Sequence, residues 1–236
     1  MKLSLLTVAT VAGAAVAAPA PAEADALVGK VQGFDVSSYQ PNVDFRAAYA
    51  GGTRFVMIKA TEGTTYKSAT FNTQYTSATS NNFIRGGYHF AHPDTSATAQ
   101  CDYFLANGGG WTSDGITLPG MIDLEGTSGK PKCYGLSASA MIAWIKAFSD
   151  RYNARTGRYP MIYTSPDWWQ SCTGNTKTFG TTIPLVLARW ASSPGTAPGG
   201  WPYQTFWQNA DTYKYGGDSE IFNGDMDQLK RFAKGG

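Results

Sequence analysis

Charged residues and histidines are scarce in this chain. Aspartate, glutamate, lysine and arginine make up 15% of the 236 residues, and the formal net charge is +2. The sequence has no basic tract and no glycine-rich phosphate-binding loop, which are common features of proteins that bind nucleic acids or nucleotides. The two histidines, His89 and His92, are spaced unlike a zinc-binding pair and have no evident third ligand. We therefore expect no nucleic-acid partner, no metal and no cofactor.

Long apolar runs are also rare, and the one that stands out lies at the N-terminus. Met1-Lys2 precedes an apolar run over 3–16, and the small residues Ala17-Ala18-Pro19 follow it. This run is too short for a membrane span, which needs about 20 apolar residues, and its flanks are those of a secretory signal peptide. We predict a signal peptide over 1–18, a short pro-segment or flexible leader over 19–30, and a secreted domain over 31–236 without a membrane anchor.

Three cysteines fit a secreted protein, in which one disulfide leaves one thiol over. Cys133 and Cys172 both lie in polar, loop-like sequence. Cys101 lies in a predicted helix, where a buried free thiol is common. The sequence therefore favours a disulfide between Cys133 and Cys172.

From Val31 onward, short apolar runs alternate with longer amphipathic stretches. Strands are predicted at 31–36, 54–60, 84–91, 118–125, 159–163, 185–190 and 204–208, with a last one between 220 and 226. Helices are predicted at about 44–50, 69–82, 96–107 and 137–155. This alternation indicates parallel strand pairing and an α/β barrel-like fold in a single domain, with loops joining the closing strands.

Two carboxylates, Asp123 and Glu125, stand inside the fourth predicted strand. Residues i and i+2 of a strand point to the same side, so both acids share one face while their neighbours are apolar. Burial of two like charges raises the pKa of one, which can then hold a proton near neutral pH. A proton donor beside an ionised partner is what glycosidic bond cleavage requires. The alternative interpretation is an ordinary strand end with solvated or ion-paired acids.

Other predicted strands also end at residues that are suited to chemistry. They are Asp35, Lys59 with Glu62, His89, Tyr163, Trp190 and Trp207. In α/β barrels the active site gathers at the C-terminal ends of the strands. This shared position favours a catalytic cleft over an ordinary strand end.

Aromatic residues near these strand ends can stack on the apolar faces of sugar rings or pack in the core. The candidates for a sugar-binding platform are Tyr39, Tyr88, Tyr163, Trp190 and Trp207. We expect His89 to be a hydrogen-bonded pocket residue. Lys59 either pairs with Glu62 or a site carboxylate, or has a structural role.

A series of motifs in chain order resembles a known family. The motifs lie at 33–40, 55–63, 85–90, 121–125, 160–164, 206–208 and 224–227. They resemble the glycoside hydrolase family 25 lysozymes, and most nearly the fungal, Chalaropsis-type N,O-diacetylmuramidases. The resemblance covers about 31–236. It implies a flattened, irregular TIM-like barrel of about eight strands and five helices that cuts the β-1,4 bond between N-acetylmuramic acid and N-acetylglucosamine.

The resemblance also assigns roles to individual carboxylates. Glu125 matches the general acid of the family and Asp123 its partner. Asp35 and a late aspartate, which we match to Asp227, are expected to line the same cleft. Asp225 is the near alternative, because the two late aspartates are two residues apart and could share a face. The resemblance further supports the disulfide predicted above.

Two mechanisms are open for this set of acids. In one, the 2-acetamido group of the substrate attacks C1 while Asp123 orients its N–H, and the configuration is retained. In the other, Asp35 or Asp227 activates a water from the far side, and the configuration is inverted. The closeness of Asp123 to Glu125 favours substrate assistance.

The sequence thus predicts a secreted, monomeric lysozyme that acts on bacterial peptidoglycan. A chitinase-like hexosaminidase is the first alternative, but the longer D-x-x-D-x-D-x-E pattern of those enzymes is absent before Asp123. A non-catalytic wall-binding lectin is the second, but every candidate carboxylate is present.

Overall fold

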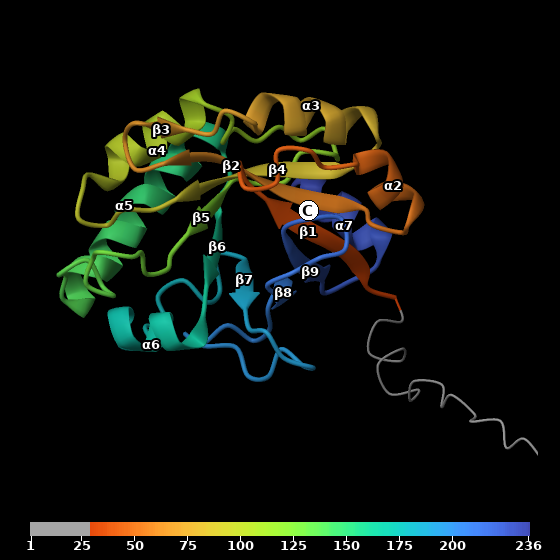
Figure 1. Cartoon of the computed structure of the whole chain (residues 1–236). Helices are drawn as coiled ribbons and strands as arrows, with labels where there is room; N and C mark the ends of the chain where they lie inside the picture. Colours follow the sequence, from red (N-terminus) through yellow and green to blue (C-terminus); the bar gives the residue numbers. More distant parts are fainter. Residues whose placement is uncertain (1–28) are drawn as a thin grey trace, which may run out of the picture.

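Eight strands of the chain form a closed barrel. The computed structural model describes residues 29–236, so the predicted signal peptide and nearly all of the predicted leader lie outside the described residues. The strands are β1 (Val31–Val36), β2 (Phe55–Glu62), β4 (Ile84–Phe90), β5 (Met121–Asp123), β6 (Met161–Thr164), β7 (Leu185–Ala188), β8 (Phe206–Ala210) and β9 (Asp218–Phe222). They pair in the order β1-β9-β8-β7-β6-β5-β4-β2, and β1 also pairs with β2, which closes the ring (Figure 1). The expected α/β barrel is confirmed; the short β3 (Tyr66–Lys67) only extends the edge of β2.

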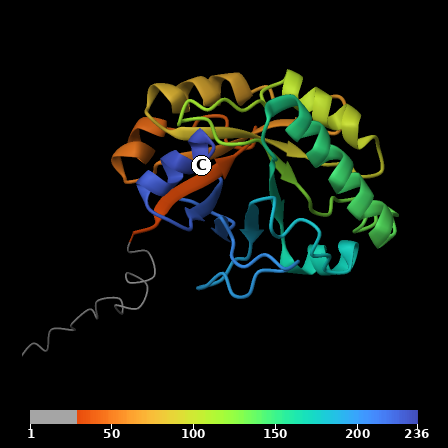
Figure 2. The same ribbon diagram turned by 180° about the vertical axis from the view of Figure 1, so that it is seen from behind.

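Six helices accompany the barrel in residues 29–236, one more than the resemblance implied and two more than the sequence patterns predicted. They are α2 (Phe45–Ala50), α3 (Phe71–Ser80), α4 (Ala97–Ala106), α5 (Ala138–Thr156), α6 (Pro166–Thr173) and α7 (Met226–Lys234). Helices α3, α4 and α5 cover one side of the barrel, whereas loops alone join β7, β8 and β9 (Figures 1 and 2). The helices therefore do not form a complete ring around the strands. None of the described helices is both long and apolar enough to cross a membrane.

Side chains along each strand alternate between the inside of the barrel and the layer beneath the helices. The inner cluster contains Val31, Phe55, Met57, Ile84, Tyr88, Leu118, Met121, Met161, Tyr163, Val186, Phe206 and Phe222. The outer cluster contains their strand neighbours, among them Phe34, Val56, Ile58, Ile122 and Leu187, packed against helix residues such as Phe104 and Phe148. Gly33 lies in β1 opposite Phe55, and a Cβ on it would lie 2.4 Å from the Phe55 ring, so this inward position requires glycine. The alternation decides which residues can reach a site inside the barrel mouth.

The last strand, β9, runs against the direction of the others. It pairs antiparallel with both β1 and β8, whereas β1, β2 and β4 to β8 pair in parallel with one another. The predicted strand between 220 and 226 was therefore placed too late, because β9 ends at Phe222 and Asp225 already caps helix α7. As a result, the beginning of β9, and not its end, lies beside the C-terminal ends of the other strands.

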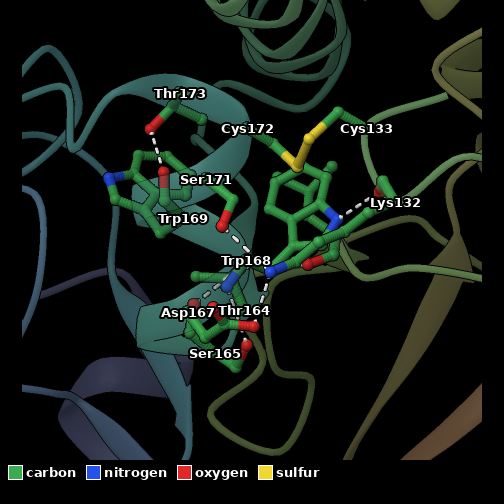
Figure 3. Close-up of a disulfide and its surroundings, with 11 residues drawn as sticks. Lys132, Cys133, Thr164, Ser165, Asp167, Trp168, Trp169, Ser171, Cys172 and Thr173 are labelled. Carbon is green, nitrogen blue, oxygen red and sulfur yellow. Dashed lines mark hydrogen bonds and ion pairs between the residues drawn. A yellow bond between two sulfur atoms is a disulfide. The ribbon is translucent and has the colours of Figure 1, made fainter. Parts of the chain in front are cut away.

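The predicted disulfide between Cys133 and Cys172 is confirmed. It joins the loop that follows β5 to helix α6, with the two Cα atoms 5.2 Å apart (Figure 3). The same contact is supported by a hydrogen bond of 3.0 Å from Trp168 Nε1 to the carbonyl oxygen of Lys132, whose Nζ lies 2.6 Å from Asp167. Cys101 is free and buried in α4, as expected.

Replacing both bridged cysteines with alanine is expected to lower the free energy of unfolding by about 2–4 kcal/mol. The bridge spans 39 residues, and without it the unfolded chain regains the freedom of that loop. Calorimetry should show a fall in the melting temperature of roughly 5–15 °C for a domain of this size. Equal melting temperatures for the variant and the wild type would show that the bridge does not stabilise the folded state.

Candidate active site

Four carboxyl groups meet at one end of the barrel. Asp35 lies near the C-terminal end of β1, Asp123 ends β5, Glu125 follows two residues later, and Asp218 begins β9. Asp35 and Asp218 lie opposite one another on their paired strands. The negative charges act on each other: Asp218 raises the pKa of Asp35 and of Glu125, and Glu125 raises that of Asp123. The structure therefore brings three of the expected acids together and adds Asp218.

Glu125 is placed to carry a proton at neutral pH. Its side chain is largely shielded from solvent, and burial raises the pKa of this carboxyl from 4.5 to about 7. The positive charge of Lys59 lowers the pKa and the negative charge of Asp218 raises it again. A carboxyl that remains partly protonated near pH 7 has the property required of a general acid.

Asp123 is a buried carboxyl with an unused oxygen. The residue is 6% exposed, and its Oδ1 atom has no hydrogen-bond partner among residues 29–236. Burial, and next the charge of Glu125, raise the pKa of Asp123 well above its ordinary value. An unpaired buried oxygen costs free energy unless a ligand supplies a donor, so this atom is suited to accept a hydrogen bond from a substrate.

Asp35 and Asp218 are held by one glutamine, Gln208 on β8. Its Nε2 donates to Asp35 Oδ2 at 2.8 Å and to Asp218 Oδ2 at 3.2 Å. Its Oε1 accepts from the Tyr163 hydroxyl at 2.9 Å and from Trp190 Nε1 at 3.0 Å. These four bonds fix the orientation of the buried amide. Burial, and next the charge of Asp218, raise the pKa of Asp35 to about 7, and the bond from Gln208 opposes them.

Lys59 supplies a positive charge to this group of acids. Its Nζ lies 2.6 Å from Glu62 Oε2 and 4.7 Å from the centre of the Phe90 ring. The other Glu62 oxygen lies 2.9 Å from His92 Nε2. Lys59 lowers the pKa of both Asp123 and Glu125, so it lies close enough to influence the pair while Glu62 holds it in place.

Aromatic residues surround the carboxylates at two levels. Tyr88 and Tyr163 face the barrel interior and are 9% and 8% exposed, and the charges of Asp35, Asp123 and Glu125 raise the pKa of both hydroxyls beyond the effect of burial. Tyr39 and Trp190 lie at the same end of the barrel and are 88% and 60% exposed. The exposed pair is available to a ligand, and the buried pair forms the floor of the site.

The comparisons with known proteins agree with this arrangement. A family model described as glycosyl hydrolases family 25 matches residues 34–218. The chain belongs to this family. It is 89% identical over 236 residues to an N,O-diacetylmuramidase of Arthroderma benhamiae, with all of both chains covered. It is 65% identical over 210 residues to an N,O-diacetylmuramidase of Chalaropsis sp, covering 87% of this chain and all of that one. The solved structure of a muramidase from Trichobolus zukalii superposes with a TM-score of 0.86 at 59% identity, covering 87% of this chain and all of that one.

In this family 25 glycoside hydrolase, the aspartate that lies beside Asp35 is Asp218, and the structure places Asp227 away from the other acids. The Asp227 side chain is 80% exposed in the first turn of α7 and lies 3.8 Å from Lys230 Nζ. Asp225 caps the same helix. Both follow the C-terminal end of β9, which runs antiparallel to β1, so they lie at the barrel end opposite Asp35. The family match also ends at Asp218.

A pair of variants separates these two assignments in the family 25 enzyme. Asp218→Asn is expected to lower turnover at least about tenfold, because it removes a charge beside Asp35 and Glu125. Asp227→Asn removes the same charge at the far end of the barrel and is expected to leave turnover unchanged. The release of reducing sugar from peptidoglycan measures both. Loss of turnover in the Asp227 variant alone would restore the original match.

His89 and Trp207 point away from the site. His89 is hydrogen-bonded as expected but lies outside the pocket, and Trp207 is not placed to contact a sugar. His89 is fully buried, with Nδ1 at 2.8 Å from Thr61 Oγ1 and Nε2 at 2.9 Å from Gln100 Oε1; burial lowers its pKa to about 4. Trp207 is 7% exposed and donates through Nε1 to the carbonyl oxygen of Arg189 at 2.7 Å. His89 follows the inward-facing Tyr88, and Trp207 precedes the inward-facing Gln208. Because side chains alternate along a strand, both His89 and Trp207 face outward.

Three residues that lie close to these acids were not predicted. Gln208 and Asp218 face the barrel mouth from β8 and β9. Tyr134 lies beside the disulfide, and the charges of Asp123 and Glu125 add to the effect of burial on its pKa. Gln208 could have been found from the alternation, because it stands two residues after the inward Phe206. Nothing in the sequence alone placed Tyr134 near the acids.

The raised pKa values make stability depend on pH. Asp35 and Glu125 titrate near pH 7 in the folded protein and near their ordinary values of 3.8 and 4.5 when unfolded. Between about pH 4 and 7 the folded state therefore binds more protons, so the free energy of unfolding falls as pH rises and levels off above about 7. Asp35→Asn is expected to raise the melting temperature at pH 7 relative to wild type but not at pH 4. An equal difference at both pH values would argue against the raised pKa of Asp35.

Proposed function

We propose that this chain is an N-acetylmuramidase, which hydrolyses the β-1,4 bond between N-acetylmuramic acid and N-acetylglucosamine in bacterial peptidoglycan. The observation that carries the proposal is the Asp123–Glu125 pair, in which a carboxyl that titrates near pH 7 stands beside a buried carboxyl with a free oxygen. The names of the similar fungal proteins, N,O-diacetylmuramidases, support the same substrate.

In the proposed reaction, Glu125 donates its proton to the oxygen that leaves with the N-acetylglucosamine residue. Its pKa of about 7 means that the acid is protonated through the weakly acidic range. After the bond breaks, the resulting carboxylate can accept a proton from the incoming water.

Asp123 assists the acetamido group of the muramic acid residue. The free Oδ1 atom accepts the acetamido N–H, and the carbonyl oxygen of the same group attacks C1 as the bond to the leaving oxygen breaks. Positive charge then develops on the acetamido group beside Asp123. This charge favours the ionised form of the Asp123 carboxyl, which in turn stabilises it. Water opens the cyclic intermediate from the same face as the departed sugar, so the configuration is retained.

Asp35 and Asp218 complete the negative surface on which this positive charge develops. Gln208 donates to both and holds them at the mouth of the barrel. Tyr39 and Trp190, which are exposed at the same end, provide faces on which sugar rings can stack. The positive charge of Lys59 lowers the pKa of Glu125 and so limits how far burial raises it.

The proposal includes secretion and action as a monomer outside the cell. The predicted signal peptide over 1–18 points to export, and the Cys133–Cys172 bridge fits an oxidising compartment. The partner is the bacterial wall itself, with no role for nucleic acid or for a membrane.

The test is to incubate the mature protein with purified peptidoglycan and, separately, with chitin, and to identify the new reducing ends by mass spectrometry. Reducing muramic acid ends are expected from peptidoglycan. Reducing N-acetylglucosamine ends, or cleavage of chitin alone, would replace the proposal with a hexosaminidase. Binding to the wall without cleavage of either polymer would indicate a lectin. Asp227→Asn serves as the matched control, since it alters an acid outside the site.

A further inference from the structure

Glu220 is a buried carboxyl that the proposed reaction does not use. It lies on β9 two residues after Asp218 and two before Phe222, so it faces the barrel interior one layer below the site. Its exposed fraction is 0%, and no N–H or hydroxyl donor among residues 29–236 reaches either carboxyl oxygen. An ionised carboxyl in such a position has no compensation for its lost hydration.

The neighbouring strands leave Glu220 one polar contact. Its partner on β1 is Gly33, which has no side chain, and its partner on β8 is Gln208, whose amide is already committed to four other bonds. The nearest inward side chain on β1 is Asp35, which lies two residues after Gly33 and faces the same interior layer. The pKa of each carboxyl responds to a hydrogen bond with the other. Two carboxyl groups can share such a bond only if one of them is protonated.

The surroundings decide which of the two carries the proton. The charged groups that act on Glu220 are Asp35 on β1 and Asp218 on its own strand; both are acids, and no described ion pair involves Glu220. Asp35 accepts a hydrogen bond of 2.8 Å from Gln208 Nε2, which stabilises its ionised form, whereas no N–H or hydroxyl donor among the described residues reaches Glu220. Burial raises the pKa of Glu220 well above its ordinary value, and the charge of Asp35 raises it further. The proton therefore resides on Glu220.

We propose that Glu220 is a positioning residue whose protonated carboxyl donates a hydrogen bond to Asp35, and so favours the ionised form of Asp35 and aims its carboxyl at the substrate. Asp35 is then held by two donors from below and beside it, Glu220 and Gln208. This inference rests on the proposed function only through the duty of Asp35 in the reaction. The state of the two carboxyl groups can be measured without a substrate.

The first test compares Glu220→Gln, which keeps a donor of the same size, with Glu220→Met, which keeps the length and removes the donor. In an NMR titration of labelled aspartate, Glu220→Met is expected to raise the pKa of Asp35 by about one unit, the value of one hydrogen bond to a charged group, and Glu220→Gln by much less. In kinetics, Glu220→Met should move the acidic limb of the pH–rate profile to higher pH by the same amount. At pH values below that limb, kcat should fall about tenfold, with KM little changed.

The second test does not depend on how well Glu220→Met folds. The infrared difference spectrum between wild type and Glu220→Gln at neutral pH is expected to show the C=O stretch of one protonated carboxyl group. Absence of that band overturns the proposal, as does an Asp35 titration that is the same in all three proteins or is shifted equally by both variants. A wild-type protein that does not cut peptidoglycan, but gives the expected band and titration, would refute the muramidase proposal and leave this one standing.

Discussion

Glutamine in place of Glu125 is expected to lower the turnover of peptidoglycan by about 10³-fold, within the range for a positioned proton donor. The amide keeps the shape of the side chain but has no acidic proton to give to the leaving oxygen. Release of reducing ends should be measured from about pH 4 to 8, because the wild-type activity is expected to fall as pH rises through the pKa of about 7. The fold should be unaffected, and the melting temperature near pH 7 should be no lower than that of the wild type.

The control for this variant is binding to insoluble peptidoglycan, which Glu125→Gln should retain. A protein that loses binding as well would have lost its site, and the comparison would then say nothing of proton transfer. Near-normal turnover at any pH in the tested range, with binding intact, would remove Glu125 from the role of general acid.

Asparagine in place of Asp123 is expected to lower turnover by at least about 10²-fold, the effect of removing a positioned charge or acceptor in a shielded site. The buried Oδ1 atom is the acceptor for the acetamido N–H in the proposed mechanism. Asparagine either presents an N–H to that group or presents a neutral oxygen that cannot stabilise the developing positive charge. The loss should appear in kcat more than in KM, because the charge develops only in the transition state.

The stereochemical course provides a second measurement for the same residue. Proton NMR of the first product formed should show retained configuration at C1 if the acetamido group is the nucleophile. Inverted configuration would show that a water attacks directly, and Asp35 or Asp218 would then be its base. Wild-type rates for Asp123→Asn would lead to the same reassignment.

The local patterns of this sequence correctly predicted much of the fold and the place of several candidate site residues. The positions of the parallel strands follow from short apolar runs, and the i, i+2 spacing of Asp123 and Glu125 places both at the mouth of the barrel. The disulfide followed from the polar surroundings of Cys133 and Cys172. Each of these features was predicted from the immediate neighbours of the residues concerned, which can be read directly from the sequence.

Other features depend on how distant strands pair, and the sequence does not show that. The direction of β9 decides whether its first or its last acid joins the site, and only the pairing with β1 and β8 reveals that Asp218 does. The predicted positions of His89 and Trp207 were wrong for a different reason. Their nearness to strand ends was given more weight than the alternation, although Tyr88 and His89 cannot both face inward. Helix α7 was missed because it is short and mostly polar, with only Leu229 and Ala233 buried.

The amide of Gln208 links the outer edge of the site to its centre. One oxygen receives hydrogen bonds from Trp190, which is 60% exposed, and from Tyr163, while the nitrogen of the same group holds Asp35 and Asp218. In the proposed reaction, a sugar ring that stacks on the indole would contact a side chain bonded to the same amide that orients the acids. Loss of the Trp190 N–H would remove one of the four hydrogen bonds that fix this amide, one of which reaches Asp35. The proposed sugar platform and the carboxyl groups are thus connected through one planar group.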